Sequence, residues 1–451
     1  MSEHLPEPTG ATLDALLSEM GRLGAVRVLA KLLSPNDNSK NQVYAGPGFD
    51  ALNLLPNSGI EEAPPVAGSL RPRFHARLRW SWLTPSGELS SAPDAKLILY
   101  PKYPEVRISG FLARSAGAPS DLMTSREPGR PMLIGICPDG SLIGFVDRSD
   151  SPIGRALATR AAGSEAGIFR EFQTGVDAEK DWRAVLLGEL GRIAADGWIQ
   201  GRRLVEPGLE VACNNRNCGG LTLEAELGIV ENSKAEPDFH GWEIKGHSVR
   251  DLTGFAGGAI TVMTQEPTLG IYAADGFRAF MHRYGYPDRS GIPDRINFGG
   301  QYRVGRRVPL TGLTMYLEGF DALTGVVDLG GGKLVLRDDA GAVALGFPVR
   351  QLIDHWSTKH SLAAYVPYMA RQYEGVQYRY GDRIRMGYGT DGLRLLRAIA
   401  DGKVYYDPAP KIEGASSARP REKRRSQLRV ASAEIAGLYG RVTTESAPAP
   451  G

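Results

Sequence analysis

The sequence predicts a protein of two domains, a β-rich domain followed by a domain that combines helices with a sheet. In the first 150 or so residues, short runs of strand-forming residues are separated by Pro and Gly turns, which is typical of a small barrel or sandwich. Beyond them, stretches with helical periodicity stand beside a strand of alternating character. With 451 residues, the chain is long enough to form two or three hydrophobic cores.

The β-rich domain is expected to begin with a helix over residues 12–31, where apolar side chains recur at helical spacing. A polar segment follows, and then the strands. Fifty-six Gly and thirty Pro in the whole chain agree with many turns. The expected strands are residues 74–83, 96–100, 106–112, 132–136 and 141–146.

A change in composition marks the domain boundary. Residues 149–152 begin a polar stretch, and residues 158–167 are rich in Ala, Gly and Arg. A helix expected over residues 181–198 then opens the second domain, with apolar positions suited to packing on a sheet. We therefore expect domains at residues 1–160 and 178–451, joined by a linker at 161–177.

The overall charge neither requires nor excludes a nucleic-acid partner. A net charge of +2 is low for a DNA-binding protein, so basic residues would have to be concentrated locally. Residues 411–430 hold seven Lys and Arg against two Glu, enough for a patch that contacts phosphates. No apolar run approaches the roughly 18 residues of a membrane span, and residues 1–12 lack the apolar region of a signal peptide.

The three cysteines predict a reducing compartment and no disulfide. Four residues separate Cys213 from Cys218, but no second Cys/His pair at metal-binding spacing lies nearby. Because zinc sites normally need three or four ligands, we expect a pair of thiols rather than a zinc site. We expect a cytoplasmic protein with no membrane partner.

The most informative stretch is a Pro-Asp pair followed, after four residues, by Glu-x-Lys. Alternation along a strand directs Glu243 and Lys245 to one face, with Trp242 and Ile244 on the other. Asp238 stands five residues before Glu243, where a bend could bring the two carboxylates together.

These residue types suit the hydrolysis of a phosphodiester. Mg²⁺ takes oxygen ligands and keeps several waters, so two carboxylates and a phosphate oxygen suffice to hold it. The ion lowers the pKa of a bound water, and a neighbouring lysine can orient that water or stabilise the transition state. The same residues also fit an ordinary surface strand with a Glu/Lys face.

The segment upstream strengthens the nuclease interpretation. It reads Gly-Gly-x-Thr-Leu-Glu-x-x-Leu-Gly-Ile from residue 219, and a helix is expected to start at 222–227. With Pro-Asp-Phe and Gly-Trp-Glu-Ile-Lys downstream, it resembles the catalytic core of MvaI/BcnI-type restriction endonucleases, relatives of the MutH nicking enzyme in the PD-(D/E)xK superfamily. The resemblance is best over residues 198–267. It implies a mixed sheet flanked by helices and an active site of Glu224, Asp238, Glu243 and Lys245, with Mg²⁺ held by Asp238 and Glu243.

The C-terminal half also resembles that family in short patches, which in the family face DNA. On this basis His360, Arg424, Arg425 and Arg429 are expected to contact DNA; arginine pairs bidentately with the guanine edge. The family's His-Gly-Thr turn is replaced here by Ser-Gln-Leu before Arg429. The alternative is that the basic run is simply a solvated surface.

The first domain resembles the effector-binding domain of EcoRII, a B3-like pseudobarrel that grips DNA with two arms. The resemblance rests on Lys-x-Leu-Ser-x-Asn-Asp from residue 31 and on Glu-Val-Arg-Ile-Ser-Gly-Phe from residue 105. It implies DNA contacts from Asn36, Gln42, Lys102, Glu105 and Arg107. The alternative is a generic β-domain whose polar loops are turns.

Together the two resemblances imply a prokaryotic type IIE restriction endonuclease. Such an enzyme hydrolyses double-stranded DNA at a short CC-x-GG site, with CCWGG favoured, and a second copy of the site acts as effector at the first domain. We expect a monomer with a cognate DNA methyltransferase in the same system. Two alternatives remain: a MutH-like repair endonuclease that nicks one strand, and a sequence-specific DNA-binding regulator with an inactive nuclease fold.

Overall fold

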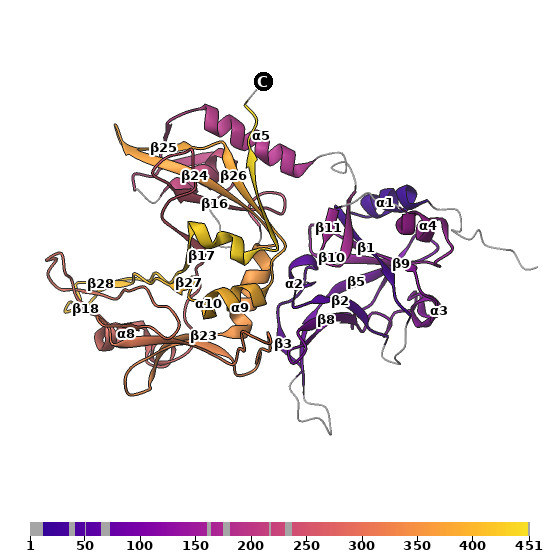
Figure 1. The fold of residues 1–451 in the computed structure, drawn as a ribbon, viewed down its shortest axis with the longest axis horizontal. Helices are drawn as coiled ribbons and strands as arrows, with labels where there is room; N and C mark the ends of the chain where they lie inside the picture. The colour runs from indigo at the N-terminus through magenta and orange to yellow at the C-terminus, as the bar shows by residue number, and fades with distance from the viewer. Residues whose placement is uncertain are drawn as a thin grey trace, which may run out of the picture. The chain divides into compact units, whose positions relative to one another are not determined.

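The computed structural model describes residues 12–35, 41–49, 51–64, 73–159, 164–174, 181–215, 218–230 and 237–449. The chain divides into two compact units, Met1–Ala184 (unit 1) and Val185–Gly451 (unit 2). Figure 1 draws unit 1 in indigo to magenta and unit 2 in magenta to yellow.

Unit 1 is built on two sheets, which are linked where the chain runs from a strand of one directly into a strand of the other. The larger sheet has the strand order β11-β12-β1-β9-β10-β5-β6 and is antiparallel except for the β10/β5 pair; the smaller, β2-β8-β7-β4-β3, is antiparallel throughout. The chain passes from β4 in one sheet to β5 in the other through Leu78. The strands are β1 (Arg27–Leu33), β2 (Val43–Pro47), β3 (Glu61–Glu62), β4 (Phe74–Arg77), β5 (Arg79–Leu83), β6 (Leu89–Ser91), β7 (Lys96–Tyr100), β8 (Glu105–Ser109), β9 (Arg130–Ile136), β10 (Ser141–Val146), β11 (Ser164–Ala166) and β12 (Phe169–Gln173).

The larger sheet of unit 1 buries its apolar face beneath two helices. Leu16 and Met20 of one helix and Leu157 of another pack in a single core with Val28 and Leu133 of the sheet. Burial of such a face is the main source of stability for an amphipathic helix. The helices of unit 1 are α1 (Leu13–Arg22), α2 (Ala51–Leu54), α3 (Ser120–Thr124) and α4 (Pro152–Thr159).

The first predicted helix is correct at its start and wrong at its end. Thr12 caps α1 by accepting a 3.2 Å hydrogen bond from the Ala15 N–H. The helix ends at Arg22 rather than at residue 31, because Gly24 adopts a positive φ of 99°. The residues that follow form β1, which pairs with β9 and β12 inside the larger sheet.

The predicted strands of unit 1 are present. Residues 96–100 and 141–146 coincide with β7 and β10, and the run 74–83 is divided into β4 and β5. Residues 164–174, expected in a linker, instead contain the whole of β11 and β12 at the edge of the larger sheet. The division between the two units therefore falls later, between residues 184 and 185.

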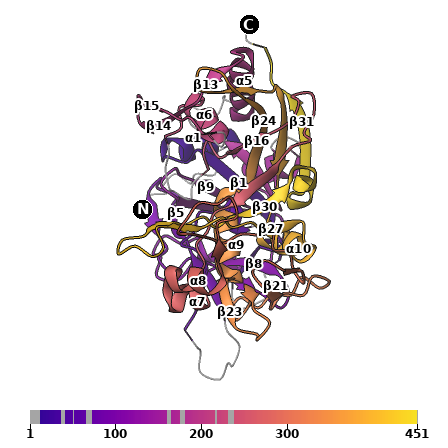
Figure 2. The same cartoon turned by 90° about the vertical axis from the view of Figure 1, so that its left-hand side faces the viewer.

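The sheet that positions the site in unit 2 is mixed. Its order is β13-β25-β24-β26-β31, with antiparallel pairs, and β16 pairs with β24 in parallel. Helix α5 covers it through Leu186 and Leu190, which pack in the core with Tyr378 and Met386 (Figures 1 and 2). The strands are β13 (Ile199–Gln200), β16 (Glu243–Ser248), β24 (Leu362–Gln372), β25 (Val376–Tyr380), β26 (Arg383–Tyr388) and β31 (Arg441–Ser446).

The rest of unit 2 consists of smaller sheets and helices. The sheets are β17-β30-β27, β18-β19-β28-β29, β20-β21-β22-β23 and β14-β15. Their strands are β14 (Arg202–Glu206), β15 (Leu209–Ala212), β17 (Ala259–Met263), β18 (Tyr286–Pro287), β19 (Arg295–Asn297), β20 (Arg307–Val308), β21 (Leu313–Glu318), β22 (Lys333–Arg337), β23 (Val343–Pro348), β27 (Val404–Tyr406), β28 (Lys411–Glu413), β29 (Arg421–Lys423) and β30 (Leu428–Ala431). The helices are α5 (Trp182–Ala195), α6 (Gly219–Glu226), α7 (Ile271–Ala274), α8 (Gly276–Tyr284), α9 (Val349–Lys359) and α10 (Gly392–Ala400), with a 3₁₀ helix at Ser432–Leu438.

The mixed sheet with helices that the resemblance implied for the second domain is thus present. None of the helices in the described ranges is both long enough and apolar enough to cross a membrane.

Candidate active site

Asp238 stands directly before a tight turn in which the chain reverses direction. The residues that flank His240 and Gly241 exchange two backbone hydrogen bonds, of 2.9 and 2.8 Å. Both turn residues have positive φ, 42° and 89°, as in a two-residue type I′ turn. The Asp238 carboxylate then accepts a 3.0 Å hydrogen bond from the backbone N–H of Ile244. The expected bend is therefore present and brings Asp238 back onto β16.

Glu243 and Lys245 lie on β16 and contact each other. The Lys245 ammonium donates a hydrogen bond to Oε1 of Glu243. Trp242 and Ile244 belong to the hydrophobic core on the other side, which confirms the predicted alternation. The Glu243 side chain is fully buried, whereas a quarter of the Lys245 side chain is exposed. The pair thus lies at the edge of the interior, with the lysine toward solvent.

Helix α6 carries Glu224 and packs closely on the sheet. A Cβ atom at Gly219 would overlap the ring of Tyr368 on β24. A Cβ atom at Gly246 on β16 would lie 3.3 Å from the Gly220 backbone. Gly219 of the sequence motif and Gly246 on β16 therefore have a physical reason, because the missing side chains let the helix approach β24 and β16, whereas a Cβ atom at Gly220 would meet open space.

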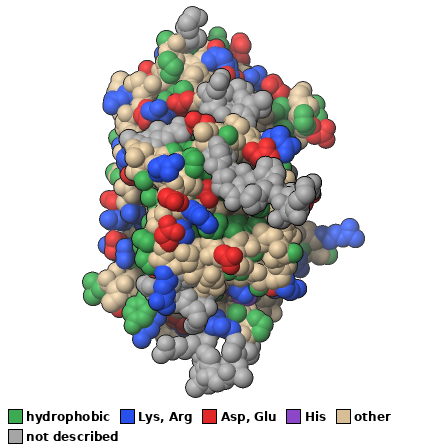
Figure 3. Space-filling model, turned by 90° about the vertical axis from the view of Figure 1, so that its right-hand side faces the viewer, with side chains coloured by type: hydrophobic (Ala, Val, Ile, Leu, Met, Phe, Trp, Pro, Cys, Tyr) green, Lys and Arg blue, Asp and Glu red, His purple; other side chains and the backbone are tan. Residues whose placement is uncertain are grey.

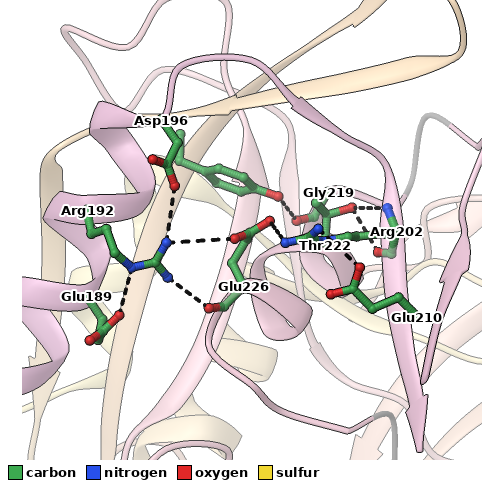
Figure 4. A network of polar contacts seen from close by, with 9 residues as sticks. Glu189, Arg192, Asp196, Arg202, Glu210, Gly219, Thr222 and Glu226 are labelled. Atoms are coloured by element: carbon green, nitrogen blue, oxygen red, sulfur yellow. Dashed lines mark hydrogen bonds and ion pairs between the residues drawn. The ribbon is translucent and has the colours of Figure 1, made fainter. Parts of the chain in front are cut away.

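A network of polar contacts fixes the orientation of α6 (Figure 4). Arg202 on β14 donates a 2.6 Å hydrogen bond to the Glu226 carboxylate, whose side chain is 6% exposed. Arg192 on α5 donates to the Glu226 backbone carbonyl at 3.1 Å. The Thr222 hydroxyl exchanges two 3.1 Å hydrogen bonds with the Arg202 backbone. Charge-assisted bonds of this kind are among the stronger ones in proteins, so they hold the helix that bears Glu224.

The acidic side chains influence one another's protonation. Burial, followed by the nearby Asp238 carboxylate, raises the pKa of Glu224 to about 7. Burial also raises the pKa of Glu243, although Lys245 opposes this effect. Burial favours the neutral form of Lys245, but the Glu243 carboxylate outweighs it and raises the pKa of that lysine. A carboxyl group that titrates near neutral pH is a common feature of functional sites.

The donor set at this site fits a divalent cation. Oε2 of Glu243 is buried and has no hydrogen-bond partner among the described residues. Leaving a buried carboxylate oxygen unpartnered is costly, and a cation would provide the missing partner. Within the described ranges, no three or more His, Cys, Asp or Glu side chains are grouped to hold a metal ion alone. An ion held by Asp238 and Glu243 would therefore take its remaining ligands from water and a phosphate oxygen, as Mg²⁺ commonly does.

The end of helix α9 places two neighbouring residues very differently. Lys359, which the sequence analysis did not select, has its Nζ 4.0 Å from Oε1 of Glu243. His360, a predicted DNA contact, is 1% exposed; its ring stacks on Trp356 and its Nε2 lies 2.9 Å from the Val262 carbonyl oxygen. Burial lowers the pKa of His360 well below its ordinary value. A contact between His360 and DNA would require the ring to leave this position.

The predicted arginine contacts of unit 2 divide into two kinds. Arg424 and Arg425 are exposed in the loop between β29 and β30; Arg424 has an ion pair of 3.6 Å with Glu422. Arg429 on β30 is partly buried and donates to Asp407 at 2.7 Å and to the Ala259 carbonyl at 2.6 Å. Arg424 also lies over the Phe277 ring, 5.0 Å from its centre. Both exposed arginines are accessible to a phosphate, although Arg424, like Arg429, already has partners.

Three of the predicted contacts in unit 1 lie close together. Gln42 accepts a 3.2 Å hydrogen bond from the Tyr100 hydroxyl, and the Arg107 guanidinium lies 5.5 Å from the centre of the Tyr100 ring. Arg107 also donates to Glu105 at 2.9 Å. Gln42 and Arg107 line a hollow of about 310 Å³ together with Lys31. Arg130 also lines the hollow, among apolar side chains such as Leu33 and Met123.

The remaining predicted contacts of unit 1 are less informative. Lys102 is exposed, with its ammonium 5.4 Å from the centre of the Tyr103 ring. Asn36 lies outside the described residues. On the face drawn in Figure 3, basic and acidic side chains are interspersed rather than gathered in one basic patch.

The expectation of three free cysteines is wrong. A disulfide joins Cys213, just after β15, to Cys218, the residue that precedes α6. Their Cα atoms are 6.1 Å apart; β14 packs on that helix and pairs with β15, an arrangement that the sequence spacing did not reveal. Cys137 is free and buried.

Asp238, Glu243 and Lys245, with one buried carboxylate oxygen that lacks a partner in the described part of the chain, have the chemistry to hold a divalent cation beside a phosphodiester. The sequence model of the MvaI/BcnI restriction endonuclease family matches residues 187–439, more than half of the chain and wholly inside unit 2. The chain belongs to this family. It is therefore a restriction endonuclease, a site-specific deoxyribonuclease.

The solved structures that match this chain include two of the restriction endonuclease MvaI, one described as a complex with cognate DNA substrate and one in the absence of DNA. Each is 17% identical to this chain, and the aligned region covers 59% of this chain and 98% of that one. The TM-scores are 0.44 and 0.32. No match was found among curated proteins.

Proposed function

We propose that this protein is a type IIE restriction endonuclease that hydrolyses both strands of double-stranded DNA with Mg²⁺ as cofactor. The observation that supports the cofactor most directly is the buried Oε2 of Glu243, which lacks a partner among the described residues. The MvaI structure titled as a complex with cognate DNA agrees with double-stranded DNA as the substrate.

In this proposal each residue of the site has a separate task. Asp238 and Glu243 bind the metal ion, which when present polarises the phosphate and lowers the pKa of a water. Lys245 orients the attacking water and stabilises charge on the phosphate oxygens. Glu224 completes the ligand shell through water, and its pKa of about 7 lets it be ionised at slightly alkaline pH.

Recognition is proposed to involve both units. In unit 2, Arg424 and Arg425 are exposed and contact the substrate; Arg429 and His360 join them only if their present partners are exchanged. In unit 1, Asn36, Gln42, Lys102, Glu105 and Arg107 bind a second copy of the site as effector, and the unit has a B3-like pseudobarrel fold. The target is a CC-x-GG sequence, with CCWGG favoured. The enzyme acts as a monomer alongside a cognate methyltransferase.

Digestion of a plasmid of known sequence tests the proposal. Purified protein with Mg²⁺ is expected to give discrete double-strand ends at CC-x-GG sites, and sequencing of the ends fixes the central base. The Asp238→Ala variant should give no cleaved ends. Nicks in one strand only would favour a MutH-like enzyme. Binding without cleavage in any divalent metal would favour a regulator.

Adding a short duplex that carries the target sequence tests the effector role separately. Cleavage of a plasmid with a single site should accelerate when the duplex is present, and a duplex with a scrambled sequence should have no effect. An unchanged rate with both duplexes would contradict the type IIE assignment while leaving the nuclease assignment intact.

A further inference from the structure

A second lysine reaches the acidic site from a part of the chain far from the motif. Strands β16 and β24 run parallel, with Glu243 opposite Ala363 and Lys245 opposite Tyr365. Helix α9 ends at Lys359, just before β24 begins at Leu362. The parallel register therefore places the end of α9 beside the start of β16.

The Lys359 ammonium faces the same carboxylate as the motif lysine. Its Nζ lies 4.0 Å from Oε1 of Glu243, the oxygen to which Lys245 donates its hydrogen bond. At 4.0 Å the contact is an ion pair and not a hydrogen bond. Among the described residues Lys359 has no hydrogen-bond partner for its three N–H donors, and its side chain is 21% exposed. The ammonium is thus held near the site by charge while its donors stay available.

Lys359 influences a second carboxyl group besides Glu243. It favours the ionised forms of both Glu224 and Glu243, as Lys245 does. It also disfavours protonation of His355, one helical turn earlier on α9. Glu224 and Glu243 are therefore both influenced by two ammonium groups, one from β16 and one from α9.

A cation at the last turn of a helix also has a simpler explanation. Lysine there interacts favourably with the helix dipole wherever its side chain points. This explanation does not account for the direction of Lys359, which reaches toward a fully buried carboxylate on another element. If Glu243 binds the metal ion, the substrate phosphate binds the same ion. An ammonium beside Glu243 is then close enough to contact that phosphate.

We propose that Lys359 is a further catalytic residue that binds a non-bridging oxygen of the scissile phosphate, opposite Lys245. This inference rests on the proposed nuclease function. When DNA is bound, the donors of Lys359 turn from Glu243 to the phosphate, where a point charge offsets the negative charge that develops in the transition state. Phosphate binding by Lys359 also contributes to DNA affinity in the absence of any metal.

The test compares K359Q and K359R with wild type, and with K333Q as a matched control. Lys333 lies in the same unit and forms a similar ion pair, 3.5 Å from Glu318 on the neighbouring strand. Single-turnover cleavage by K359Q is expected to be about 100-fold slower, as for the loss of one charged donor to the transition state. K359R should recover part of this rate, and K333Q should match wild type.

A metal-free measurement separates a phosphate contact from a structural role. In EDTA, the plot of log binding constant against log salt concentration should lose about one unit of slope in K359Q, because one phosphate contact is missing. K333Q should keep the wild-type slope. A lysine that only stabilised α9 would instead lower the melting temperature of K359Q and leave the slope unchanged.

The outcomes distinguish this inference from the proposed function. If wild type cleaves DNA and K359Q cleaves within threefold of it, the role of Lys359 is overturned and the nuclease assignment stands. An unchanged salt slope in K359Q would also overturn it. If wild type fails to cleave, the proposed function fails, and the metal-free slope alone decides whether Lys359 contacts phosphate.

Discussion

The two units place their candidate functional residues in contrasting environments. In unit 2, Glu243 is fully buried, shares one oxygen with two lysines and leaves the other without a partner among the described residues. In unit 1, Gln42 and Arg107 are partly exposed and have ordinary partners in Tyr100 and Glu105. A site that performs chemistry keeps charges in an unfavourable setting, whereas a binding surface needs only accessible groups. Substitutions in unit 2 should therefore change the rate of cleavage itself, whereas substitutions in unit 1 should change only the response to an effector.

The largest expected effect comes from removing a buried carboxylate. E243Q should slow single-turnover cleavage by at least about 1,000-fold, because the amide keeps the shape of the side chain but loses a metal ligand. The melting temperature of the metal-free protein checks that the variant is folded, because the substitution also removes the carboxylate partner of Lys245 and Lys359. E318Q, in the same unit, serves as the control. Cleavage by E243Q at the wild-type rate would show that the site lies elsewhere.

Unit 1 should respond to substitution in a different way. The double variant R107A/K102A is expected to lose most of the stimulation by the effector duplex. The ratio of the cleavage rate with the duplex to the rate without it should then fall toward one. The reason is that both residues are proposed to contact the effector and neither lies in the unit that holds the carboxylates. The rate ratio is measured on a plasmid with a single site. If the duplex stimulates the double variant as strongly as the wild type, Lys102 and Arg107 do not bind the effector.

The pH dependence should identify Glu224. Its pKa of about 7 lies above the ordinary value, so the folded protein retains a proton that the unfolded chain releases at lower pH. This proton stabilises the folded protein fully at a pH below the ordinary pKa of a glutamate. The stabilisation is lost as the pH rises through the folded-state pKa of about 7. Thermal unfolding of metal-free wild type should thus show a fall in stability from pH 5 to 8 relative to E224Q. Parallel curves for the two proteins would contradict the assignment.

Ionisation of Glu224 should lower the stability of the metal-free protein but raise its apparent affinity for Mg²⁺. Because the carboxylate form is needed near the metal, the apparent affinity for Mg²⁺ should rise between pH 6 and 8 in the wild type. In E224Q this rise should be smaller. Titration of the cleavage rate with Mg²⁺ at three pH values provides the measurement.

The smallest effect is expected from the disulfide between Cys213 and Cys218. It closes a loop of only a few residues, so its reduction should lower stability by at most about 2 kcal/mol. Since α6 is also held by the Arg202 and Arg192 contacts with Glu226, cleavage should continue in a reducing agent. Differential scanning calorimetry with and without reductant measures the change. A complete loss of cleavage on reduction would show that the bond itself positions Glu224.

Several features of the fold could be predicted because they depend on nearby residues. The strands β7 and β10 match their predicted ranges, since alternation and turn residues define them locally. Strand β1 was predicted as helix because residues 12–31 are apolar at helical spacing, and only pairing with β9 and β12 makes the second half extended. Tertiary contacts thus decided a segment whose local pattern was ambiguous.

The sequence by itself determined the core of the candidate site. Asp238, the turn at His240 and Gly241, Glu243 and Lys245 all lie within a few residues, so a turn and a strand suffice to bring them together. Only the tertiary structure decided that Lys359 joins them while His360, the next residue, is buried. More than one hundred residues separate Lys359 from Glu243. The parallel register of β16 and β24 makes them neighbours, and no local pattern specifies which strand pairs with which.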